Sequence, residues 1–364
     1  MCKKIFIAAT GQQCGKTSIS IALLHLARQH YRRVGFIKPL GPKPTRYCGR
    51  WMDQDAALLT RIFHLDSDLS FMSPVVLHHE STRQVLDGKI TPESLERRIL
   101  QAAQALEGRC DLLIVEGAGH GGVGSVVNLN NARIARLLDA PVLMVAEAGI
   151  GQVVDNVHLN MALYHQENVD LRLLLINKLF PEKRRYTMEY LQRAFSRHPF
   201  PVMAGFDYSP ILANPTLRHV AKLLKAPLRG NRKCATRIIH QVHLGAASTQ
   251  RVVDIMEDAT LLIVTSSRNE LLVTLASLYN VPEYRNRIAG LVIPGVLPVS
   301  QVSQQILDRS HIPYIRTESL SSTEVFSAID KDVSKINPED YEKIHLLKSM
   351  AEQHLDFSAI NDLF

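Results

Sequence analysis

Thr10–Ser18 reads TGQQCGKTS, a pattern whose residue types and spacing predict a phosphate-binding loop. It follows the strand-like run KIFIAA, and Lys16–Thr17 opens a helical pattern. In such a strand–loop–helix unit, backbone N–H groups surround phosphate oxygens and the helix amino terminus adds a favourable dipole. We expect Lys16 to reach the β- and γ-phosphates of a nucleotide and the Thr17 hydroxyl to bind Mg²⁺. The nucleotide-binding residues predicted in the loop are Thr10, Gly11, Gln12, Gln13, Cys14, Gly15, Lys16, Thr17 and Ser18.

Glu116 ends a second strand-like run, LLIVE, and glycines follow it. A carboxylate beside the loop in a parallel sheet can hold magnesium directly or through water. The alternative is an ordinary strand-end acid that faces solvent. Because the four preceding residues are apolar, this strand end is predicted to be buried, where an unpaired carboxylate is costly. We therefore favour the metal-binding role for Glu116.

Three further polar residues could take part in nucleotide binding or phosphoryl transfer. Lys38 ends GFIK, Asp55 opens a helical pattern in DQDAALL, and Asn177 ends LLLIN. A lysine can stabilise charge on a transferring phosphoryl group, and an acid can complete a magnesium shell. An asparagine can read a purine edge. The residues alone do not distinguish these roles from simpler ones. Lys38 and Asp55 could equally be charges on the surface, and Asn177 could simply cap a strand.

Hydrophobic periodicity predicts the elements that must position these residues. Through the first 210 residues, short apolar runs alternate with helical patterns, as in parallel βαβ units. Several runs are apolar without alternation, as in a sheet covered on both faces. The fold class is therefore α/β, with a doubly wound, mostly parallel sheet and ligands at the carboxyl ends of its strands. The predicted strands are Lys4–Ala9, Arg33–Lys38, Leu112–Glu116, Val142–Ala146, Leu171–Asn177 and Val202–Gly205, and helices include Thr17–Gln29, Thr91–Ala105, Asn131–Leu138 and Val154–Gln166.

A domain boundary is expected at Asp207–Pro215, where DYSPILANP concentrates turn-forming residues. A second α/β pattern follows it, and one or two amphipathic helices are expected over Asn337–Phe364. We expect a P-loop domain over 1–212, a smaller α/β domain over 213–332 and a helical tail over 333–364. The strands expected in the smaller domain are Thr236–His243, Thr260–Thr265, Ile288–Ile293 and Ile312–Ile315, with helices over Ser248–Glu257, Arg268–Tyr279 and Ser300–Arg309.

Composition narrows the class of protein. Apolar residues make up 46% and charged residues 21% of the 364 residues, which is typical of a globular protein. The apolar runs are too short for a membrane span, and no leader pattern is recognisable, so we expect a cytoplasmic protein. The net charge of +7 is spread among acids without an aromatic-rich basic stripe, so no nucleic-acid partner is expected. The five scattered cysteines predict neither a disulfide framework nor a structural zinc site.

Taken together, the motifs of residues 1–210 resemble dethiobiotin synthetase and its P-loop relatives among the cobyrinic-acid amidases. The shared motifs, in order, are TGQQCGKTS, YRRVGFIKP, DQDAALL, VEGAGH, APVLMVAEAGIGQVVDN and INK. The resemblance implies ATP and Mg²⁺ as cofactors. It implies that Lys16, Thr17, Asp55 and Glu116 bind them, with Thr17, Asp55 and Glu116 at the metal. Lys38 matches the family's second lysine, which helps to phosphorylate a carbamate, so Lys16 and Lys38 are the catalytic candidates, and Asn177 matches an asparagine that contacts adenine.

A two-domain group is more similar still: a dethiobiotin-synthetase-like domain followed by a DRTGG domain, as at the amino terminus of long bacterial phosphotransacetylases. EGAGHGGVGSVVNLNNARIARLL, NKLFPEKRR and ANPTLRHVAKLL carry this resemblance. It implies cytoplasmic, oligomeric proteins with a regulatory or sensing role, and a protein partner in acetate or central metabolism. Two departures stand out. Pro42 replaces a serine that helps to hold the diamino substrate, and only Arg268 of the name-giving motif remains in Ser267–Leu271.

Three functions follow as hypotheses. The first is an ATP-binding regulator or sensor, with slow ATP hydrolysis as an option, coupled to the DRTGG-like domain. The second is an ATP-dependent ligase that activates a carboxylate or carbamate through Lys16 and Lys38. The third is a scaffold for enzymes of acetate metabolism. Acetyl transfer by this chain alone is not expected.

Overall fold

The computed structural model describes residues 2–147, 149–332 and 334–364. Its residues form two compact units, one comprising the chain up to Tyr208 together with Ile344–Phe364, the other comprising Ser209–Lys343. These units differ from the expected three-part division, because the expected tail is shared between them. Ala148, in one of the quoted motifs, and Val333, at the expected start of the tail, lie outside the described residues.

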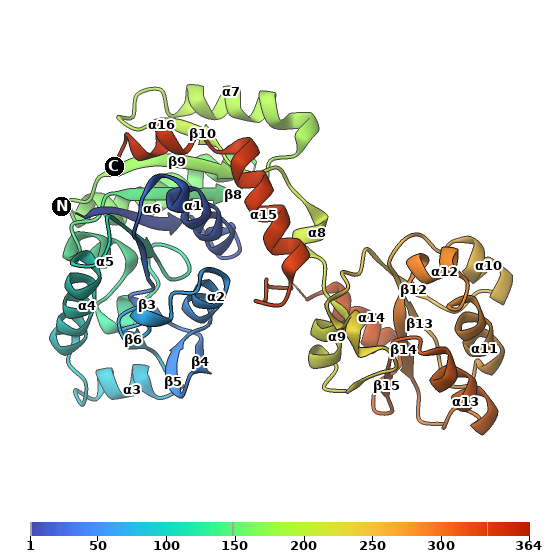
Figure 1. The fold of residues 1–364 in the computed structure, drawn as a ribbon. Coiled ribbons are helices and arrows are strands. Elements are labelled where there is room, and N and C mark those ends of the chain that lie inside the picture. Colours follow the sequence, from blue (N-terminus) through green and yellow to red (C-terminus); the bar gives the residue numbers. More distant parts are fainter. Residues whose placement is uncertain (1, 148, 333) are drawn as a thin grey trace. The chain divides into compact units, whose positions relative to one another are not determined.

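The first unit is built on a parallel sheet of six strands in the order β10-β9-β8-β1-β7-β2. Figure 1 labels β8, β9 and β10 of this sheet. Every pairing in this sheet is parallel. The strands are β1 (Lys3–Ala9), β2 (Val34–Ile37), β7 (Leu112–Glu116), β8 (Val142–Glu147), β9 (Leu171–Asn177) and β10 (Val202–Ala204). They lie within one residue of the predicted strands at each end. The strand order reverses at β1, which is where an open α/β sheet forms its ligand crevice.

Helices cover both faces of this sheet. On one face, α4 (Pro92–Glu107), α5 (Asn131–Leu137), α6 (Ile150–Gln166) and α7 (Arg184–Ala194) share a core with alternate strand residues such as Phe6 and Ala8. On the other, α1 (Lys16–His30) packs on β1 and β7. The helix starts follow capping rules, since the side chains of Thr91 and Asn130 accept backbone N–H groups at α4 and α5. The predicted doubly wound α/β sheet is therefore confirmed.

In the segment between β2 and α4 the sequence predicted only a helix opening near Asp55, which is α2, and the structure adds several short elements. The elements of this segment are β3 (Leu40–Gly41), β4 (Pro44–Tyr47), β5 (Arg50–Asp53), α2 (Gln54–Phe63), η1 (Asp66–Asp68), β6 (Val75–Val76) and α3 (Ser81–Leu86). β4 and β5 form an antiparallel hairpin whose turn uses Cys48 and Gly49 with positive φ. The hairpin leads directly into α2 and so fixes the start of that helix. Two further 3-10 turns, η2 (Ser125–Val127) and η3 (Pro181–Lys183), lie later in this unit.

The chain returns to the first unit through its last two helices, α15 (Tyr341–His354) and α16 (Phe357–Asn361). Phe357 is 4% exposed, and its ring lies 4.8 Å from that of His30 on α1. The Tyr31 hydroxyl donates a hydrogen bond to Asn361 Oδ1 at 2.5 Å. His25 and Glu352 form a further contact at 2.7 Å. The carboxyl-terminal helices are thus part of the same packed body as the P-loop helix.

The second unit contains a five-stranded sheet in the order β11-β15-β14-β13-β12, parallel except for the edge strand β11. Its strands are β11 (Leu228–Arg229), β12 (Gln241–Leu244), β13 (Thr260–Ile263), β14 (Ile288–Pro294) and β15 (Tyr314–Thr317). Its helices are α8 (Pro210–Ala213), α9 (Leu217–Leu223), η4 (Arg232–Thr236), α10 (Thr249–Asp254), α11 (Asn269–Leu278), α12 (Pro282–Arg287), α13 (Gln301–Ser310) and α14 (Ser322–Asp330). Two apolar cores lie on opposite faces, one with α10, α11 and α13 and the other with α9 and α14. A second, smaller α/β region is therefore confirmed.

The expected strand Thr236–His243 is wrong in its first half. Ile238 pairs with Thr216 in an isolated antiparallel bridge, and Ile239 packs with Leu217 and Val220 of α9. The guanidinium of Arg237 donates to Ile288 O at 2.8 Å. The apolar residues that suggested a long strand are buried against a helix, and only β12 joins the sheet.

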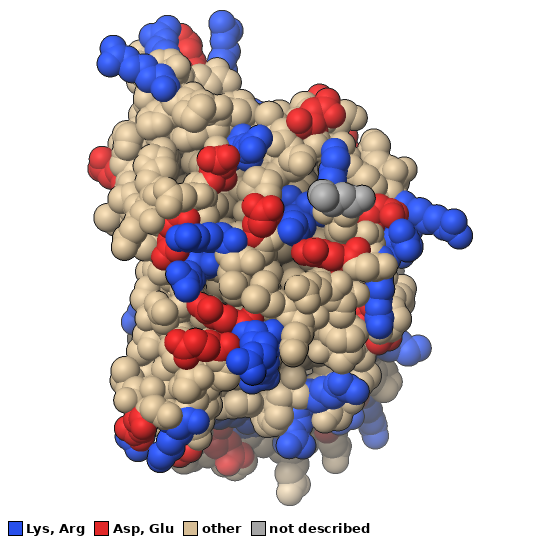
Figure 2. All heavy atoms as spheres, turned by 90° about the vertical axis from the view of Figure 1, so that its left-hand side faces the viewer, with Lys and Arg blue, Asp and Glu red and all other residues tan. Residues whose placement is uncertain are grey.

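Two further observations concern the distribution of charge on the surface and the length of the helices. On the face that Figure 2 shows, lysine and arginine are interleaved with aspartate, glutamate and uncharged residues. Across the described ranges, no helix has both the length and the apolar character that crossing a membrane requires.

Candidate nucleotide-binding site

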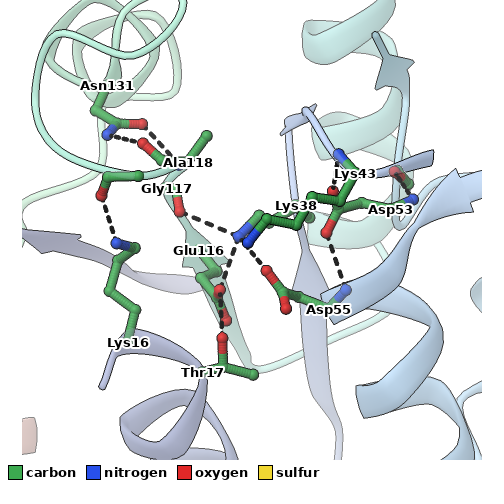
Figure 3. Close-up of polar contacts among 12 residues, drawn as sticks. Lys16, Thr17, Lys38, Lys43, Asp53, Asp55, Glu116, Gly117, Ala118 and Asn131 are labelled. Atoms are coloured by element: carbon green, nitrogen blue, oxygen red, sulfur yellow. Dashed lines mark hydrogen bonds and ion pairs between the residues drawn. The ribbon is translucent and has the colours of Figure 1, made fainter. Parts of the chain in front are cut away.

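The predicted phosphate loop lies at the carboxyl end of β1, beside the carboxyl ends of β2 and β7. Figure 3 shows Lys16 and Thr17 from the start of α1, Lys38 from the end of β2 and Glu116 from the end of β7 around one small region. Asp55, in the first turn of α2, points into the same region. Parallel strands end at the same edge of a sheet, so residues far apart in the chain meet here. The structure thus brings Lys16, Thr17, Lys38, Asp55 and Glu116 together.

The loop itself is held in a left-handed turn. Gly15, the residue before α1, has φ +94°, and Gln13 has φ +63°. A Cβ atom at Gly15 would lie 2.2 Å from Asn177 Nδ2, so the loop requires glycine there for space as well as for conformation. Gln12 and Gln13 are exposed, and Gly11 and Ser18 are half-buried. The loop therefore presents its turn to solvent while its ends are anchored.

Two asparagines hold the loop from outside. Asn177 Nδ2 donates to Cys14 O at 2.9 Å, and its Oδ1 accepts the Phe206 N–H at 3.1 Å. Asn160 on α6 donates to Thr10 O at 3.1 Å and accepts the Gly121 N–H at 2.9 Å. Asn177 contacts the loop, and its predicted contact with adenine stays a prediction. Sequence reasoning missed Asn160, because nothing in a helical pattern marks a residue that reaches a distant loop.

Lys16 is 8% exposed, and its ammonium donates a hydrogen bond to the carbonyl oxygen of Gly119. Burial and, after it, the charge of Lys38 lower the pKa of Lys16 to about 8, against the opposing charge of Glu116. A phosphate group beside Lys16 would offset both effects, because an anion favours the charged form of lysine. The position of Lys16 at the amino terminus of α1 suits such a ligand.

Lys38 lies between two carboxylates. Its Nζ is 2.7 Å from Glu116 Oε1 and 2.9 Å from Asp55 Oδ2, and it also donates to Gly117 O at 3.2 Å. Lys38 is 2% exposed. Burial alone would lower the pKa of Lys38, but Glu116 and then Asp55 together outweigh burial and raise it. Lys38 is thus a charged member of the site rather than a surface lysine.

Glu116 has one satisfied and one unsatisfied oxygen. Its Oε1 accepts hydrogen bonds from Lys38 and from the Thr17 hydroxyl at 3.2 Å, whereas Oε2 is buried and has no partner among the described residues. A buried carboxylate oxygen without a partner is costly unless a cation or donor reaches it. Carboxylate and hydroxyl oxygens are the ligands that Mg²⁺ prefers. In the described part of the chain no three His, Cys, Asp or Glu side chains form a metal cluster, so a magnesium ion here would also need phosphate oxygens.

Asp53, which the sequence analysis did not select, positions Asp55. Asp53 is fully buried. Its Oδ1 caps α2 by accepting the Asp55 N–H at 2.9 Å, and its Oδ2 accepts the Lys43 N–H at 3.0 Å. Burial raises the pKa of Asp53 to about 6, against the opposing charge of Lys38. Gly41 permits this packing, since a Cβ there would lie 2.6 Å from Asp53 Cβ. An acid directly before a helical pattern is a capping signal, and it could have identified Asp53.

A loop of this kind between β1 and α1 of a parallel sheet defines the class of P-loop NTPase-like proteins. Residues 3–216 match the family model AAA_26, described as an AAA domain, over more than half of the chain. The chain belongs to this family.

Curated relatives agree with this assignment. The chain is 27% identical over 214 residues to the ATP-dependent dethiobiotin synthetase BioD of Aromatoleum aromaticum, which covers 57% of this chain and 95% of that protein. It is 21% identical over 369 residues to the phosphate acetyltransferase of Nitratidesulfovibrio vulgaris, which covers 99% of this chain and 51% of that protein. The chain thus spans about half the length of the phosphate acetyltransferases that it matches. The resemblance to a dethiobiotin-synthetase-like domain in a phosphotransacetylase-like architecture is confirmed.

Solved structures show similarity over a similar range. The MinD cell division protein of Aquifex aeolicus matches with a TM-score of 0.38 and 13% identity, over 58% of this chain and 84% of that one. The MinD protein of Pyrococcus horikoshii, complexed with Mg-ADP, matches with a TM-score of 0.36 and 13% identity, over 58% and 84%.

Proposed function

We propose that the first unit binds ATP with Mg²⁺ and that nucleotide binding serves a regulatory or sensing role coupled to the second unit. The proposal of nucleotide binding rests on one observation. Five polar side chains cluster at one end of the sheet, namely Lys16, Thr17, Lys38, Asp55 and Glu116. Two of these residues are cationic and two are acidic, so the site offers donors to phosphate and oxygens to a metal.

Each residue has a distinct role in this proposal. Lys16 and the loop N–H groups bind the β- and γ-phosphates, and the Thr17 hydroxyl, Asp55 and Glu116 hold Mg²⁺. Magnesium, when bound, neutralises phosphate charge. Asp53 keeps Asp55 in place through the helix cap, and Asn160 and Asn177 keep the loop in place. Asn177 is further proposed to reach adenine.

The regulatory part rests on the relatives and on the second unit. The phosphate acetyltransferase of Nitratidesulfovibrio vulgaris covers 99% of this chain, whereas the dethiobiotin synthetase covers 57%. In the second unit, Arg268 follows β13 and donates to Gly245 O at 2.9 Å and Ala247 O at 3.0 Å, so it ties two loops at the carboxyl edge of that sheet. Retention of this arginine supports a DRTGG-like domain. We further propose a cytoplasmic homo-oligomer with a protein partner in acetate or central metabolism.

A second candidate is the ATP-dependent ligase that activates a carboxylate or carbamate. The buried position of Lys38 between Asp55 and Glu116 favours it. A fixed cation at a transferring phosphoryl group stabilises developing charge, and it contributes less to binding alone. Pro42, in place of a substrate-holding serine, argues against the biotin substrate.

Calorimetric titration of the purified chain with ATP, ADP and GTP, with and without magnesium, tests nucleotide binding. We expect ATP to bind more tightly with magnesium, and Lys16→Ala to remove binding. Lys89→Ala is the matched control, since Lys89 is an exposed lysine that forms a surface ion pair with Asp87. Equal ATP affinity in Lys16→Ala and wild type would disprove the proposed site.

Measurements of ATP turnover distinguish the regulatory role from the ligase activity. The regulatory role predicts either no ATP hydrolysis or slow hydrolysis without any second substrate. The ligase predicts turnover that needs a carboxylate or an amine with bicarbonate, and that is lost in Lys38→Ala while ATP affinity remains.

A further inference from the structure

Two cysteines that are far apart in the chain place their sulfur atoms together at the amino ends of β1 and β7. Cys2 Sγ and Cys110 Sγ are 3.2 Å apart. All five cysteines of the chain carry free thiols. This end of the sheet is opposite the edge that carries the phosphate loop, so the nucleotide site uses neither thiol.

Backbone hydrogen bonds hold both cysteines in place. Lys3, directly after Cys2, donates its N–H to Asp111 O at 2.9 Å, and Cys110 donates its own N–H to Leu106 O at 3.1 Å at the end of α4. The neighbouring strand leaves room for the thiol, since a Cβ at Gly35 of β2 would lie 3.0 Å from Cys110 Sγ. The contact between the sulfurs therefore follows from the register of β1 on β7.

The two thiols have different environments. Cys110 is 7% exposed, whereas Cys2 is half-buried and open to small reagents. A hydrogen bond with Cys110 lowers the pKa of Cys2, with help from Lys4 and against burial, Glu107 and Asp111. The same hydrogen bond and burial raise the pKa of Cys110. The more accessible sulfur is thus also the one that ionises first, and the thiolate is the reactive form of cysteine.

We propose that Cys2 and Cys110 form a dithiol site that a small disulfide such as oxidised glutathione converts to an intramolecular disulfide. The Cys2 thiolate attacks one sulfur of oxidised glutathione, forms a mixed disulfide and releases one glutathione thiolate. Cys110 then loses its proton, attacks the Cys2 sulfur and releases the second glutathione. The two protein thiols lose two electrons, and these reduce one glutathione disulfide to two thiols.

The disulfide would cross-link β1 and β7 far from the nucleotide. β1 spans seven residues, which is about 23 Å at ~3.3 Å per residue. The cross-link closes a long loop between Cys2 and Cys110 and should constrain the unfolded chain. Oxidation should therefore raise thermal stability and leave ATP affinity unchanged.

To test this, the reduced full chain is treated with oxidised glutathione, and the remaining thiols are blocked with N-ethylmaleimide. Disulfides are then mapped by mass spectrometry of a non-reducing digest. We expect a linked pair of peptides containing Cys2 and Cys110, reversal by dithiothreitol, and a rise in Tm of roughly 5 °C or more. Cys48→Ser is the matched control, because Cys48 is exposed and its loss should leave the linked pair intact. In Cys2→Ser both the linked peptides and the rise in Tm should disappear.

Two results would overturn the proposal. In the first, Cys2 and Cys110 each carry glutathione or N-ethylmaleimide, and no linked peptides form even in excess oxidised glutathione. The other is an equal rise in Tm in Cys2→Ser, which would assign the effect to another thiol.

Discussion

At the residue scale, Lys38 joins the buried carboxylate of Glu116 and the half-buried carboxylate of Asp55 in the candidate site. Its ammonium contacts both Glu116 and Asp55, and one oxygen of Glu116 has no partner in the part of the chain that the structure describes. Removing one partner of a buried ion pair leaves an uncompensated charge in a region of low dielectric. Lys38 therefore has a structural role in addition to its proposed chemical one.

We predict that Lys38→Met lowers the free energy of unfolding by about 3–5 kcal/mol, measured by urea denaturation. Arg193→Met is the control, since Arg193 and Glu189 form an exposed pair one helical turn apart whose loss should cost less than about 1 kcal/mol.

The double variant Lys38→Met/Glu116→Gln should be more stable than Lys38→Met, because it removes the charge that Lys38→Met leaves buried. If the double variant were less stable than Lys38→Met, the proposed compensation between these charges would be wrong.

At the element scale, α6 joins two loops that no local sequence signal connects. Asn160 donates to Thr10 O at the start of the phosphate loop and accepts the Gly121 N–H of the loop after β7. Both groups lie in a buried region. The helix thus sets the distance between the phosphate loop and the segment that carries Gly119, the partner of Lys16.

We predict that Asn160→Ala destabilises the protein by about 1–3 kcal/mol, because it leaves a buried carbonyl and a buried N–H without partners. ATP affinity should fall as well, measured by calorimetry. Leu159→Ala on the neighbouring, 74% exposed position should change neither quantity. Equal effects of the two variants would contradict the proposed link between α6 and the loop.

The first turn of α15 carries a different polar contact. Lys343 is fully buried, and its ammonium donates to the carbonyl oxygens of Leu212, at 3.3 Å, and Asn214. Burial lowers the pKa of Lys343, while Asp340 and Glu342 oppose the shift. The folded protein therefore releases this proton at lower pH than the unfolded chain, whose lysine has its ordinary pKa of 10.5.

Stability should accordingly rise as pH increases from the lowered pKa of Lys343 towards 10.5, because the unfolded state binds more protons in that window. Lys343→Met should lose this contribution, so its stability relative to wild type should fall as pH increases towards 10.5. Urea denaturation at several pH values measures this difference. Lys331→Met, at an exposed lysine of the same unit, should follow the wild-type profile, and identical profiles for all three proteins would refute the prediction.

At the scale of the whole molecule, the first unit is assembled from both ends of the chain. Phe357 packs beside His30 and Tyr31 at the end of the P-loop helix, and Leu347 and Ile360 are buried as well. The helices that follow the second unit are therefore needed to complete the apolar core of the first.

We predict that Phe357→Ala lowers the free energy of unfolding of the first unit by about 3–5 kcal/mol, as expected for loss of a buried aromatic ring. Differential scanning calorimetry of the full chain measures it. Tyr341→Ala, at a residue 73% exposed, should stay within about 0.5 kcal/mol of wild type. A Phe357→Ala protein as stable as the Tyr341→Ala protein would show that the carboxyl-terminal helices do not contribute to this core.

The order of strands and helices could be predicted because those signals are local. The buried strands of the first sheet are continuous apolar runs, and TGQQCGKTS marks a turn that only a few residue types permit. The β4–β5 hairpin gave no such signal, since each of its strands has only four residues and neither is a continuous apolar run. The capping signal before α2 could have identified Asp53 as a helix cap, but its contact with the Lys43 N–H depends on the hairpin.

By itself, the sequence determined the phosphate loop, the parallel α/β sheet and the likeness to dethiobiotin-synthetase-like proteins. The tertiary structure decided whether Lys38 and Asp55 are surface charges or members of a site, because that depends on where the ends of β2 and β7 and the start of α2 meet. It likewise decided that Asn160 holds the loop, that Cys2 lies against Cys110, and that the last helices complete the first unit. Each of these depends on contacts between segments far apart in the chain, and no local residue pattern encodes such contacts.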